Sequence, residues 1–238
     1  MSAAEPDLSI VIPAYNEEKR LGPTLEKIGR FFAVRSEKWE LIVADDGSSD
    51  GTARIAETAA KAFPAIRFHG GAHAGKGAAV KRGVLDARGR WILVCDADSA
   101  TPIEEYARMR PAMDAGAALV VGSRLLKDPA RPVRRIWVRE LSSRLHNRLV
   151  RSFLLRGVSD AHCGFKLFRR DAARDIFGSQ ILPGFGFDLE ILYLAEKRGY
   201  SIREIPVTWT AQPGSKVNPF REPFILVADI FRVKKIHG

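Results

Sequence analysis

The sequence predicts a protein of the α/β class: one domain built on a mostly parallel sheet covered by helices, with an elaboration toward the C-terminus. Two observations predict this class. Apolar runs of strand length alternate with amphipathic segments of helix length through the first half of the chain. The 238 residues are also 46% hydrophobic and 28% charged, which is too apolar for a disordered chain and sufficient for one large buried core.

Five strands are expected in the first half, and a helix-length segment follows each of the first four. The first helix carries Pro23 at its first position, where a missing N–H breaks no helical bond. Ligands of such sheets bind at the carboxyl ends of the strands, so chemistry is expected just after each strand. The expected strands span residues 8–13, 39–44, 66–69, 91–96 and 119–123, and the expected helices span 23–33, 51–63, 76–87 and 102–115.

The second half has a mixed pattern. We expect a strand over residues 165–168, a helix over about 188–197, a strand over 202–208 and a last amphipathic helix after Pro223. The pattern leaves open whether this last helix packs on the core or contacts a partner surface.

The positive charge is concentrated in residues 124–156. The whole chain has a net charge of +10, and this segment holds ten basic and two acidic residues, so it carries +8 of that total. The rest of the chain is nearly neutral. A cationic segment within a neutral domain indicates an anionic partner.

The start of the chain and the two cysteines bear on location. Residues 1–9 lack the basic and apolar regions of a secretory signal, and no apolar run approaches the ~20 residues of a membrane-spanning helix. Cys95 and Cys163 have no partner at a metal-ligand spacing, so we expect reduced thiols and a cytoplasmic protein.

Carboxylates follow three of the expected strands. Glu17 follows the first strand, Asp45 and Asp46 the second, and Asp96 and Asp98 the fourth. Residues two apart in an extended segment point the same way, so Asp96 and Asp98 can converge on one cation. Two hard oxygens suit Mg²⁺ or Mn²⁺ that shares its shell with phosphates and water. The alternative, for Asp46 or Asp98 taken singly, is a cap on the next helix.

The glycine-rich stretch 70–77 holds Lys76 but matches neither a P-loop nor a dinucleotide-binding fingerprint, because Ala78 follows Gly77. A flexible turn before a helix is the simpler interpretation. Contact between Lys76 and a diphosphate or ribose is the other, and the sequence leaves both open.

Five motifs stand in chain order: Ser9-Ile-Val-Ile-Pro-Ala-Tyr-Asn-Glu17, Asp45-Asp-Gly-Ser-Ser-Asp-Gly-Thr52, Gly75-Lys-Gly77, Asp96-Ala-Asp98 and Val121-Gly-Ser-Arg124. Together they resemble glycosyltransferase family 2, whose GT-A fold is Rossmann-like. The resemblance implies that residues 1–123 form a nucleotide-sugar-binding half. Residues 124–238 would then form the acceptor-side half of a single domain.

Motifs of the second half narrow the resemblance. They are Asp160-Ala-His-Cys-Gly-Phe-Lys-Leu-Phe168, Phe187-Asp-Leu-Glu-Ile-Leu-Tyr193, Trp209 and Gly214-Ser-Lys216. They are similar to motifs of the dolichyl-phosphate β-glucosyltransferases, with the polyprenyl-phosphate mannosyltransferases as close relatives. Ala100 stands where the mannosyl branch usually has a Gln that helps to bind metal, so no third protein ligand is implied here.

The resemblance implies roles at matching positions. Asp96 and Asp98 would hold Mg²⁺ or Mn²⁺, and Asp46, rather than Asp45, would contact the uracil. The catalytic residues would be Asp98, Arg139 and Asp188. The acceptor phosphate would meet Arg124, Arg135, Arg139, Ser143 and Lys216. The nucleotide sugar would contact Pro13, Tyr15, Glu17, Asp45, Asp46, Lys76, Asp96, Ala97, Asp98 and Arg124.

The implied activity is metal-dependent, inverting transfer of glucose from UDP-glucose to a polyprenyl phosphate. A phosphate monoester has a second pKa of about 6 and is mostly a dianion at neutral pH, so we expect no essential base. Asp188 and Glu190 are the candidates if a base is needed. The alternative is that they serve only as carboxylates in the first turn of a helix, where negative charge is favoured.

A helical stripe lies within the basic segment. Val138, Leu141, Leu145 and Leu149 fall on one side of a helical wheel, with arginines on both flanks. This pattern fits a helix that lies in an anionic membrane surface, and a core-facing helix with a solvated basic face has the same pattern. We expect peripheral association with the cytoplasmic face of a membrane.

Three alternatives stay open. The donor could be GDP-mannose, or the acceptor a glycan, because loop geometry decides both choices. The third is a nucleic-acid-binding protein that uses the arginine-rich segment. That function leaves the strand-end carboxylates unexplained, and they would repel a phosphate backbone, so we expect no nucleic-acid partner.

Overall fold

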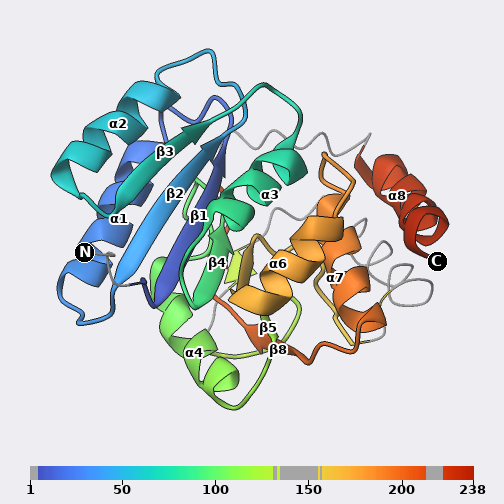
Figure 1. Cartoon of the computed structure of the whole chain (residues 1–238). Helices are drawn as coiled ribbons and strands as arrows, with labels where there is room; N and C mark the ends of the chain where they lie inside the picture. The colour runs from blue at the N-terminus through green and yellow to red at the C-terminus, as the bar shows by residue number, and fades with distance from the viewer. Residues whose placement is uncertain (1–4, 131–132, 135–154, 156, 213–221) are drawn as a thin grey trace.

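A seven-stranded sheet organises the computed structural model, which describes residues 5–130, 133–134, 155, 157–212 and 222–238 (Figure 1). The strand order is β3-β2-β1-β4-β7-β5-β8. The strands span Leu8–Ala14 (β1), Trp39–Asp45 (β2), Ile66–Gly70 (β3), Trp91–Cys95 (β4), Leu119–Ser123 (β5), Phe165–Arg169 (β7) and Ile202–Pro206 (β8).

The first four strands pair in parallel, as predicted. β1 lies between β2 and β4, and Ala14 at the end of β1 is in register with Asp45 at the end of β2. All seven residues of β1 are buried, because a parallel strand covered on both faces has no solvent side. The carboxyl ends of these strands form one edge of the sheet, which we call the carboxyl edge.

β7 runs against its neighbours in the middle of the sheet. It pairs antiparallel with β4 on one side and with β5 on the other, and β8 then pairs in parallel with β5. Phe165, the first residue of β7, lies opposite Cys95, the last residue of β4. The chain just before β7, residues 160–164, therefore reaches the carboxyl edge beside Asp96.

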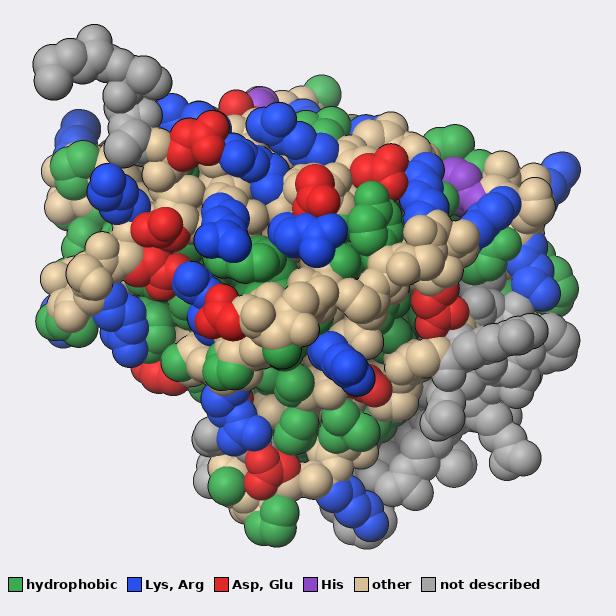
Figure 2. All heavy atoms as spheres, turned by 60° about the horizontal axis from the view of Figure 1, so that its bottom comes forward, with side chains coloured by type: hydrophobic (Ala, Val, Ile, Leu, Met, Phe, Trp, Pro, Cys, Tyr) green, Lys and Arg blue, Asp and Glu red, His purple; other side chains and the backbone are tan. Residues whose placement is uncertain are grey.

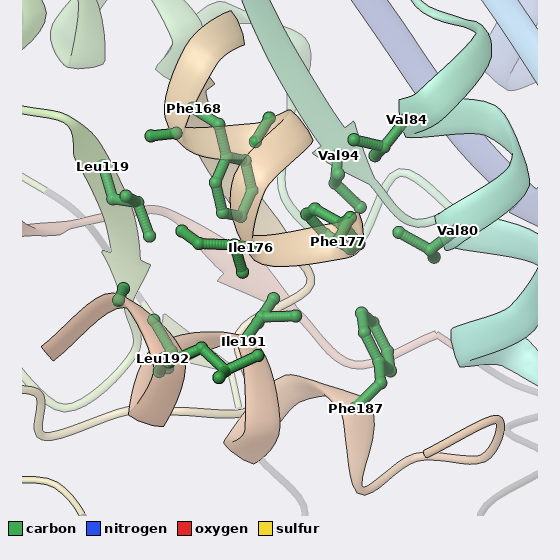
Figure 3. Packing of buried hydrophobic residues seen from close by; sticks show 14 of the residues in the cluster. Val80, Val84, Val94, Leu119, Phe168, Ile176, Phe177, Phe187, Ile191 and Leu192 are labelled. Carbon is green, nitrogen blue, oxygen red and sulfur yellow. The ribbon is translucent and has the colours of Figure 1, made fainter. Parts of the chain in front are cut away.

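Helices cover both faces of the sheet. They span Leu21–Ala33 (α1), Thr52–Ala62 (α2), Lys76–Asp86 (α3), Tyr106–Asp114 (α4), Arg170–Ser179 (α6), Phe187–Lys197 (α7) and Glu222–His237 (α8). Successive strand residues alternate between two cores: Ile10 and Ile12 pack with α1 and α4, whereas Val11 packs with α3, α6 and α7. Figure 3 shows part of the second core, in which side chains of α6 and α7 converge with those of the strands.

Two helices differ from the sequence prediction. α1 begins at Leu21, so Pro23 is its third residue rather than its first, which is tolerated because the first N–H groups of a helix have no intrahelical partner. The sequence pattern does not predict α6. It follows β7 directly from Arg169 to Arg170, with no turn residue to mark the change.

Two further boundaries also differ. The segment expected as a helix from residue 102 begins as a 3₁₀ turn, Ile103–Glu105, before α4. The strand expected over 202–208 ends at Pro206, which has no N–H to extend the ladder. The chain then forms Trp209–Thr210 (β9), which pairs with Val133–Arg134 (β6) in a separate two-stranded sheet.

One face of the molecule agrees with the nearly neutral charge expected outside residues 124–156. Figure 2 shows a face on which basic and acidic side chains are interspersed. Most of the basic segment, including its apolar stripe, lies outside the described residues. In the part of the chain that the structure describes, no helix is long and apolar enough to cross a membrane.

Candidate active site

Asp46, at the end of β2, organises the loop that leads into α3. The side chain is buried, and its carboxylate accepts hydrogen bonds from the N–H groups of Ala74 at 2.9 Å and Gly75 at 2.9 Å. His73 Nδ1 lies 2.8 Å from Asp46 Oδ2. Asp46 therefore fixes residues 73–75 at the carboxyl edge.

The neighbouring strand-end residues have local partners too. Asp45 accepts hydrogen bonds from the N–H groups of Gly47 and Ser48 and so closes its own turn. Glu17 binds Arg20 at 2.7 Å, and its N–H donates to Thr52 Oγ1. Pro13 is buried in β1. The carboxylates that follow β1 and β2 therefore lie at the carboxyl edge, as expected. Asp45 and Asp46 are also hydrogen-bonded to the backbone of loops at this edge.

An aromatic pair forms the outer wall of this region. The rings of Tyr15 and His73 stack with centroids 4.3 Å apart and planes 20° apart, and both side chains are exposed. Two stacked rings beside a carboxylate suit a planar heterocycle. The sequence gives no local signal of contact between His73 and Tyr15, because the two residues lie on separate loops.

Asp96 and Asp98 lie beyond β4, together with Lys76. Lys76 Nζ donates a hydrogen bond of 2.6 Å to Asp96 Oδ1, and Asp98 accepts one from the N–H of Ala100. Burial, and then the charge of Asp96, raise the pKa of Asp98. The two carboxylates therefore repel one another, and one cation already relieves that repulsion at Asp96.

The Asp96 carboxylate packs directly against Gly164. A Cβ atom at Gly164 would overlap the Asp96 carboxylate, and no positive φ constrains this glycine. The absence of a side chain is therefore the feature that matters. Ala97, between the two aspartates, is buried and accepts a hydrogen bond from Thr24 Oγ1 through its carbonyl, which ties the segment to α1.

The turn before α3 is a packing surface rather than a flexible connection. Gly75 has a φ of +115°, and a Cβ there would lie 2.5 Å from Pro183 O. Gly77 meets Leu182 O in the same way at 2.7 Å, and the Ala78 N–H donates to Pro183 O. The glycines allow the chain before α7 to hold Lys76 at the carboxyl edge.

Arg124 follows β5 and is held in a buried ion pair. Its Nε and Nη2 atoms each donate a 2.7 Å hydrogen bond to Asp160, and its guanidinium lies 5.5 Å from the Trp209 ring centroid. Burial would raise the pKa of Asp160, but the charge and hydrogen bonds of Arg124 outweigh it and lower the pKa to about 2. Trp209 is thus a wall beside this cation.

Asp188 and Glu190, in the first turn of α7, both have structural partners. Asp188 is buried and accepts a hydrogen bond of 2.5 Å from the buried Lys166. Glu190 has no exposed surface, and its two oxygens accept the N–H groups of Ile181 and Leu182 at 2.7 and 2.8 Å. His237 of α8 also lies 2.6 Å from Glu190. Both carboxylates are therefore buried and hydrogen-bonded within the fold, and whether either acts as a base stays a prediction.

Comparison with known proteins identifies the family. The sequence model described as "Glycosyl transferase family 2" matches residues 9–177. The chain belongs to glycosyltransferase family 2. It is 36% identical to a dolichyl-phosphate beta-glucosyltransferase of Dictyostelium discoideum over 95% of this chain and 73% of that protein. It is 33% identical to the human dolichyl-phosphate beta-glucosyltransferase, over 90% and 70% of the two chains. The chain is therefore a glycosyltransferase.

Solved structures show the same architecture. The mannosyl-3-phosphoglycerate synthase of Rubrobacter xylanophilus matches with a TM-score of 0.73 at 20% identity, over 95% of this chain and 73% of that one. A glucosyl-3-phosphoglycerate synthase of Mycobacterium tuberculosis, solved with Mn²⁺, UDP-glucose and phosphoglyceric acid, matches with a TM-score of 0.70 at 19% identity, over 98% and 81%. The GT-A fold predicted for this family 2 enzyme is thereby confirmed.

The donor set of this glycosyltransferase fits a divalent cation. Asp96 and Asp98 offer hard oxygen ligands, and the Lys76 ammonium shows that the Asp96 carboxylate already binds a positive charge. Because Gly164 has no side chain, the Asp96 carboxylate has space beside it. Among the described residues, no group of three or more His, Cys, Asp or Glu side chains could hold a metal ion. Two carboxylates would leave the remaining coordination positions to phosphate and water, so they fit an ion that arrives with a nucleotide.

Four residues predicted for the acceptor phosphate of the family 2 enzyme, Arg135, Arg139, Ser143 and Lys216, lie outside the described residues. The structure brings the other predicted groups together at the carboxyl edge, and their roles toward substrate stay predictions. Reasoning from sequence missed His73, Gly164 and Lys166. Of these, Gly164 and Lys166 stand inside the quoted motif of residues 160–168 and could have been singled out.

Proposed function

We propose that this glycosyltransferase transfers glucose from UDP-glucose to a polyprenyl phosphate with inversion at the anomeric carbon. The observation that carries the proposal is the 32–37% identity to dolichyl-phosphate beta-glucosyltransferases over most of the chain. The carboxyl edge supports it, because an aromatic pair, two neighbouring carboxylates and a lysine lie there together.

The donor would lie along the carboxyl edge from β2 to β4. Tyr15 and His73 would stack on the uracil, beside the Asp46 loop. The diphosphate would lie near the N-terminal end of α3, where helix dipole and Lys76 both favour an anion. This placement leaves the glucose toward Arg124 and the acceptor-side half.

The chain would assist departure of UDP by placing charge around the diphosphate. Bound on Asp96 and Asp98, a Mg²⁺ or Mn²⁺ ion would supply Lewis-acid stabilisation of the leaving UDP. Asp98 would be the catalytic residue that binds the ion, and Gly164 would hold the Asp96 carboxylate in position to bind it too. Lys76 would add a second positive charge beside the diphosphate. Electrostatic stabilisation of this kind acts most strongly in a site that excludes water.

The acceptor would attack as a dianion without a protein base. A phosphate monoester is mostly deprotonated at neutral pH, and Asp188 and Glu190 are bound to Lys166 and to backbone N–H groups. Arg124, Arg135, Arg139, Ser143 and Lys216 would orient the acceptor phosphate. Positioning of two reactants can supply a large part of the rate enhancement.

A lipid acceptor would bring the enzyme to a membrane surface. The exposed side of α8 is a surface that could contact the membrane. Phe231 is 63% exposed, whereas Ile230 and Val233 are buried on the other side of the helix. Lys234 and Lys235 are exposed beside Phe231. An exposed aromatic ring beside lysines suits an anionic interface. Peripheral association with a cytoplasmic membrane face, through α8 and residues 124–156, is part of this proposal.

A transfer assay tests the proposal. The protein is incubated with radiolabelled UDP-glucose or GDP-mannose, a polyprenyl phosphate, and Mg²⁺ or Mn²⁺, and label in the lipid extract is counted. We expect label from UDP-glucose, in a product that a β-glucosidase cleaves, and loss of label with Asp98→Asn. Label from GDP-mannose instead would make the enzyme a mannosyltransferase. Label only in a soluble glycan would refute the lipid acceptor.

A further inference from the structure

Lys76 occupies the place on Asp96 that the proposed metal ion would take. Its Nζ atom lies 2.6 Å from Asp96 Oδ1, the separation of a direct ion pair. The Lys76 side chain is 22% exposed and that of Asp96 is 37% exposed, so an ion from solvent can reach the pair. Two cations cannot bind the same carboxylate oxygen at full strength, because they repel one another.

The surrounding charges hold Lys76 in this position. The negative charges of Asp96, Asp188 and Asp98 all act on the Lys76 ammonium, and Asp96 is the one in direct contact with it. Asp188 is already paired with Lys166 at 2.5 Å, so it is no full substitute for Asp96. Removing Lys76 from Asp96 would leave a mostly buried ammonium without a close counter-charge, which is strongly unfavourable.

A nucleotide would change this balance. Lys76 is the first residue of α3, and the loop of residues 73–75 and the backbone of 182–184 fix the start of that helix. A diphosphate bound at this helix end would place new anionic oxygens beside the ammonium. Lys76 could then leave Asp96 without losing its counter-charge.

We infer that Lys76 and the divalent ion compete for Asp96, and that Lys76 moves to the diphosphate when ion and nucleotide bind together. The inference rests on the proposed function, since it takes Asp96 as a metal ligand and a nucleoside diphosphate as part of the donor. Lys76 thereby couples the two ligands: the ion binds weakly alone and strongly with nucleotide. By reciprocity, the nucleotide binds more tightly when the ion is present.

The test measures Mn²⁺ binding without any turnover. The electron paramagnetic resonance signal of free Mn²⁺ is titrated with wild-type protein and with Lys76→Met and Lys76→Gln, each with and without UDP. Both variants should bind Mn²⁺ alone about tenfold more tightly than wild type, and the gain from UDP should shrink. Lys76→Arg keeps the charge and should bind Mn²⁺ alone as weakly as wild type. Lys61→Met, on the exposed side of α2, removes an equal charge and should change nothing.

The outcomes separate this inference from the proposed function. If wild type binds Mn²⁺ with UDP and Asp96→Asn does not, the metal site stands. If in that case both neutral Lys76 variants bind Mn²⁺ alone no better than wild type, the competition is refuted. If wild type binds no Mn²⁺ even with UDP, the metal site of the proposed function is itself wrong. Thermal melting of each variant verifies that the protein compared is folded.

Discussion

At the scale of single residues, Gly164 shows how a missing side chain can position a neighbouring carboxylate. The Asp96 carboxylate fills the space where a Cβ at Gly164 would lie. The residue touches no substrate in the proposed mechanism. It acts through Asp96, and the strand register of β7 against β4 brings the two together.

We therefore expect Gly164→Ala to displace Asp96 and to lower the affinity for Mn²⁺ in the presence of UDP by at least about tenfold, with a similar loss of transfer. The matched control is Gly178→Ala in α6, where a Cβ has nothing within 4 Å and the change should be neutral or slightly stabilising. Mn²⁺ titration and thermal melting measure both effects. Unchanged Mn²⁺ binding in folded Gly164→Ala would show that Asp96 does not depend on this glycine.

Substitution of Asp188 should lower the stability of the protein without a matching loss of activity. Asp188→Asn leaves the buried Lys166 without its counter-charge, so the free energy of unfolding should fall by about 3–5 kcal/mol. Transfer by the folded fraction should be largely kept, because the scheme needs no base. Urea unfolding and kcat per folded protein measure the two effects, and the double change Lys166→Met with Asp188→Leu should recover stability. A loss of kcat as deep as that of Asp98→Asn would make Asp188 a catalytic base.

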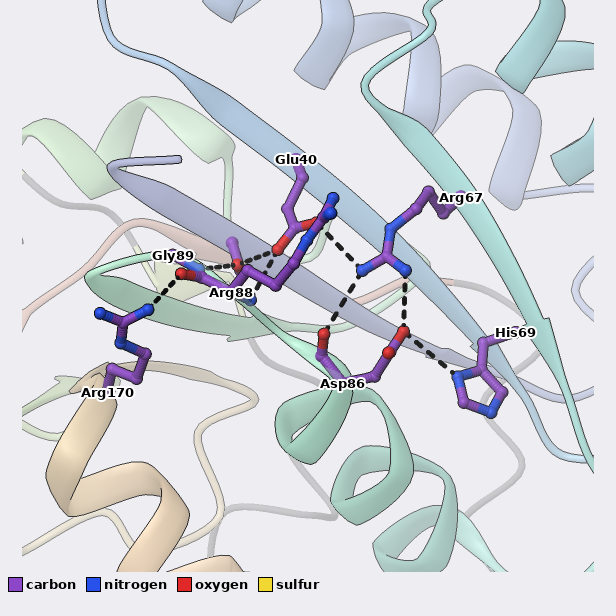
Figure 4. Close-up of polar contacts among 8 residues, drawn as sticks. Glu40, Arg67, His69, Asp86, Arg88, Gly89 and Arg170 are labelled. Atoms are coloured by element: carbon purple, nitrogen blue, oxygen red, sulfur yellow. Dashed lines mark hydrogen bonds and ion pairs between the residues drawn. The ribbon is translucent and has the colours of Figure 1, made fainter. Parts of the chain in front are cut away.

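At the scale of elements, a polar cluster around Glu40 joins strands at the edge opposite the active site (Figure 4). Glu40 of β2 is buried and accepts hydrogen bonds from Ser9 of β1, from Arg67 of β3 and from Arg88 in the turn between α3 and β4. Ser9 and Glu40 are in register across the sheet. One carboxylate thus ties together four separate parts of the chain.

Because of this cluster, the stability of the fold should depend on pH in the acidic range, where Glu40 becomes protonated. Burial would raise the pKa of Glu40, but hydrogen bonds from Ser9 and Arg88 and the charge of Arg67 outweigh it and lower the pKa. A carboxyl group with a lowered folded-state pKa stabilises the fold at neutral pH, and this contribution is lost as pH falls from the ordinary value of 4.5 through the folded value. The melting temperature of Glu40→Gln should therefore lie below that of wild type at about pH 7, and the difference should narrow below about pH 4.5.

Thermal melts at several pH values measure this difference. Glu26→Gln serves as the control, because Glu26 forms an exposed ion pair with Arg30 and should change stability little at any pH. A constant gap between wild type and Glu40→Gln across the acid range would contradict the assignment.

At the scale of the whole molecule, the proposed membrane association makes a prediction for the exposed face of α8. Each basic residue at an anionic surface contributes about 1 kcal/mol, so reversing Lys234 and Lys235 to Glu should weaken vesicle binding by more than about tenfold. Phe231→Ala should weaken it further by removing buried apolar area. Co-sedimentation with anionic vesicles measures binding, and Lys61→Glu on α2 is the control. Equal binding by all variants would exclude α8 from the membrane contact.

Much of this architecture is readable from local sequence patterns. Apolar periodicity places β1 to β5, and the rule of strand ends alone gathers Glu17, Asp46 and Asp96 at one edge of the sheet. Contacts between distant segments are not readable in this way. The direction of β7, the stacking of His73 on Tyr15 and the ion pair of Lys76 all depend on pairings that no local period encodes.

The antiparallel strand β7 also affects how the protein folds during its synthesis. Among the described strands, β5 joins the rest of the sheet through β7, since it pairs with β7 and β8 and not with β4. During synthesis from the N-terminus, residues up to Ser123 would emerge with β5 unattached and the side of β4 away from β1 open. We expect a fragment that ends there to aggregate, and to recover its structure only when the remaining residues are supplied in trans. The proposed nucleotide site would thus be completed late, because Gly164 beside Asp96 and residues 182–184 beside the start of α3 all follow β5 in the chain.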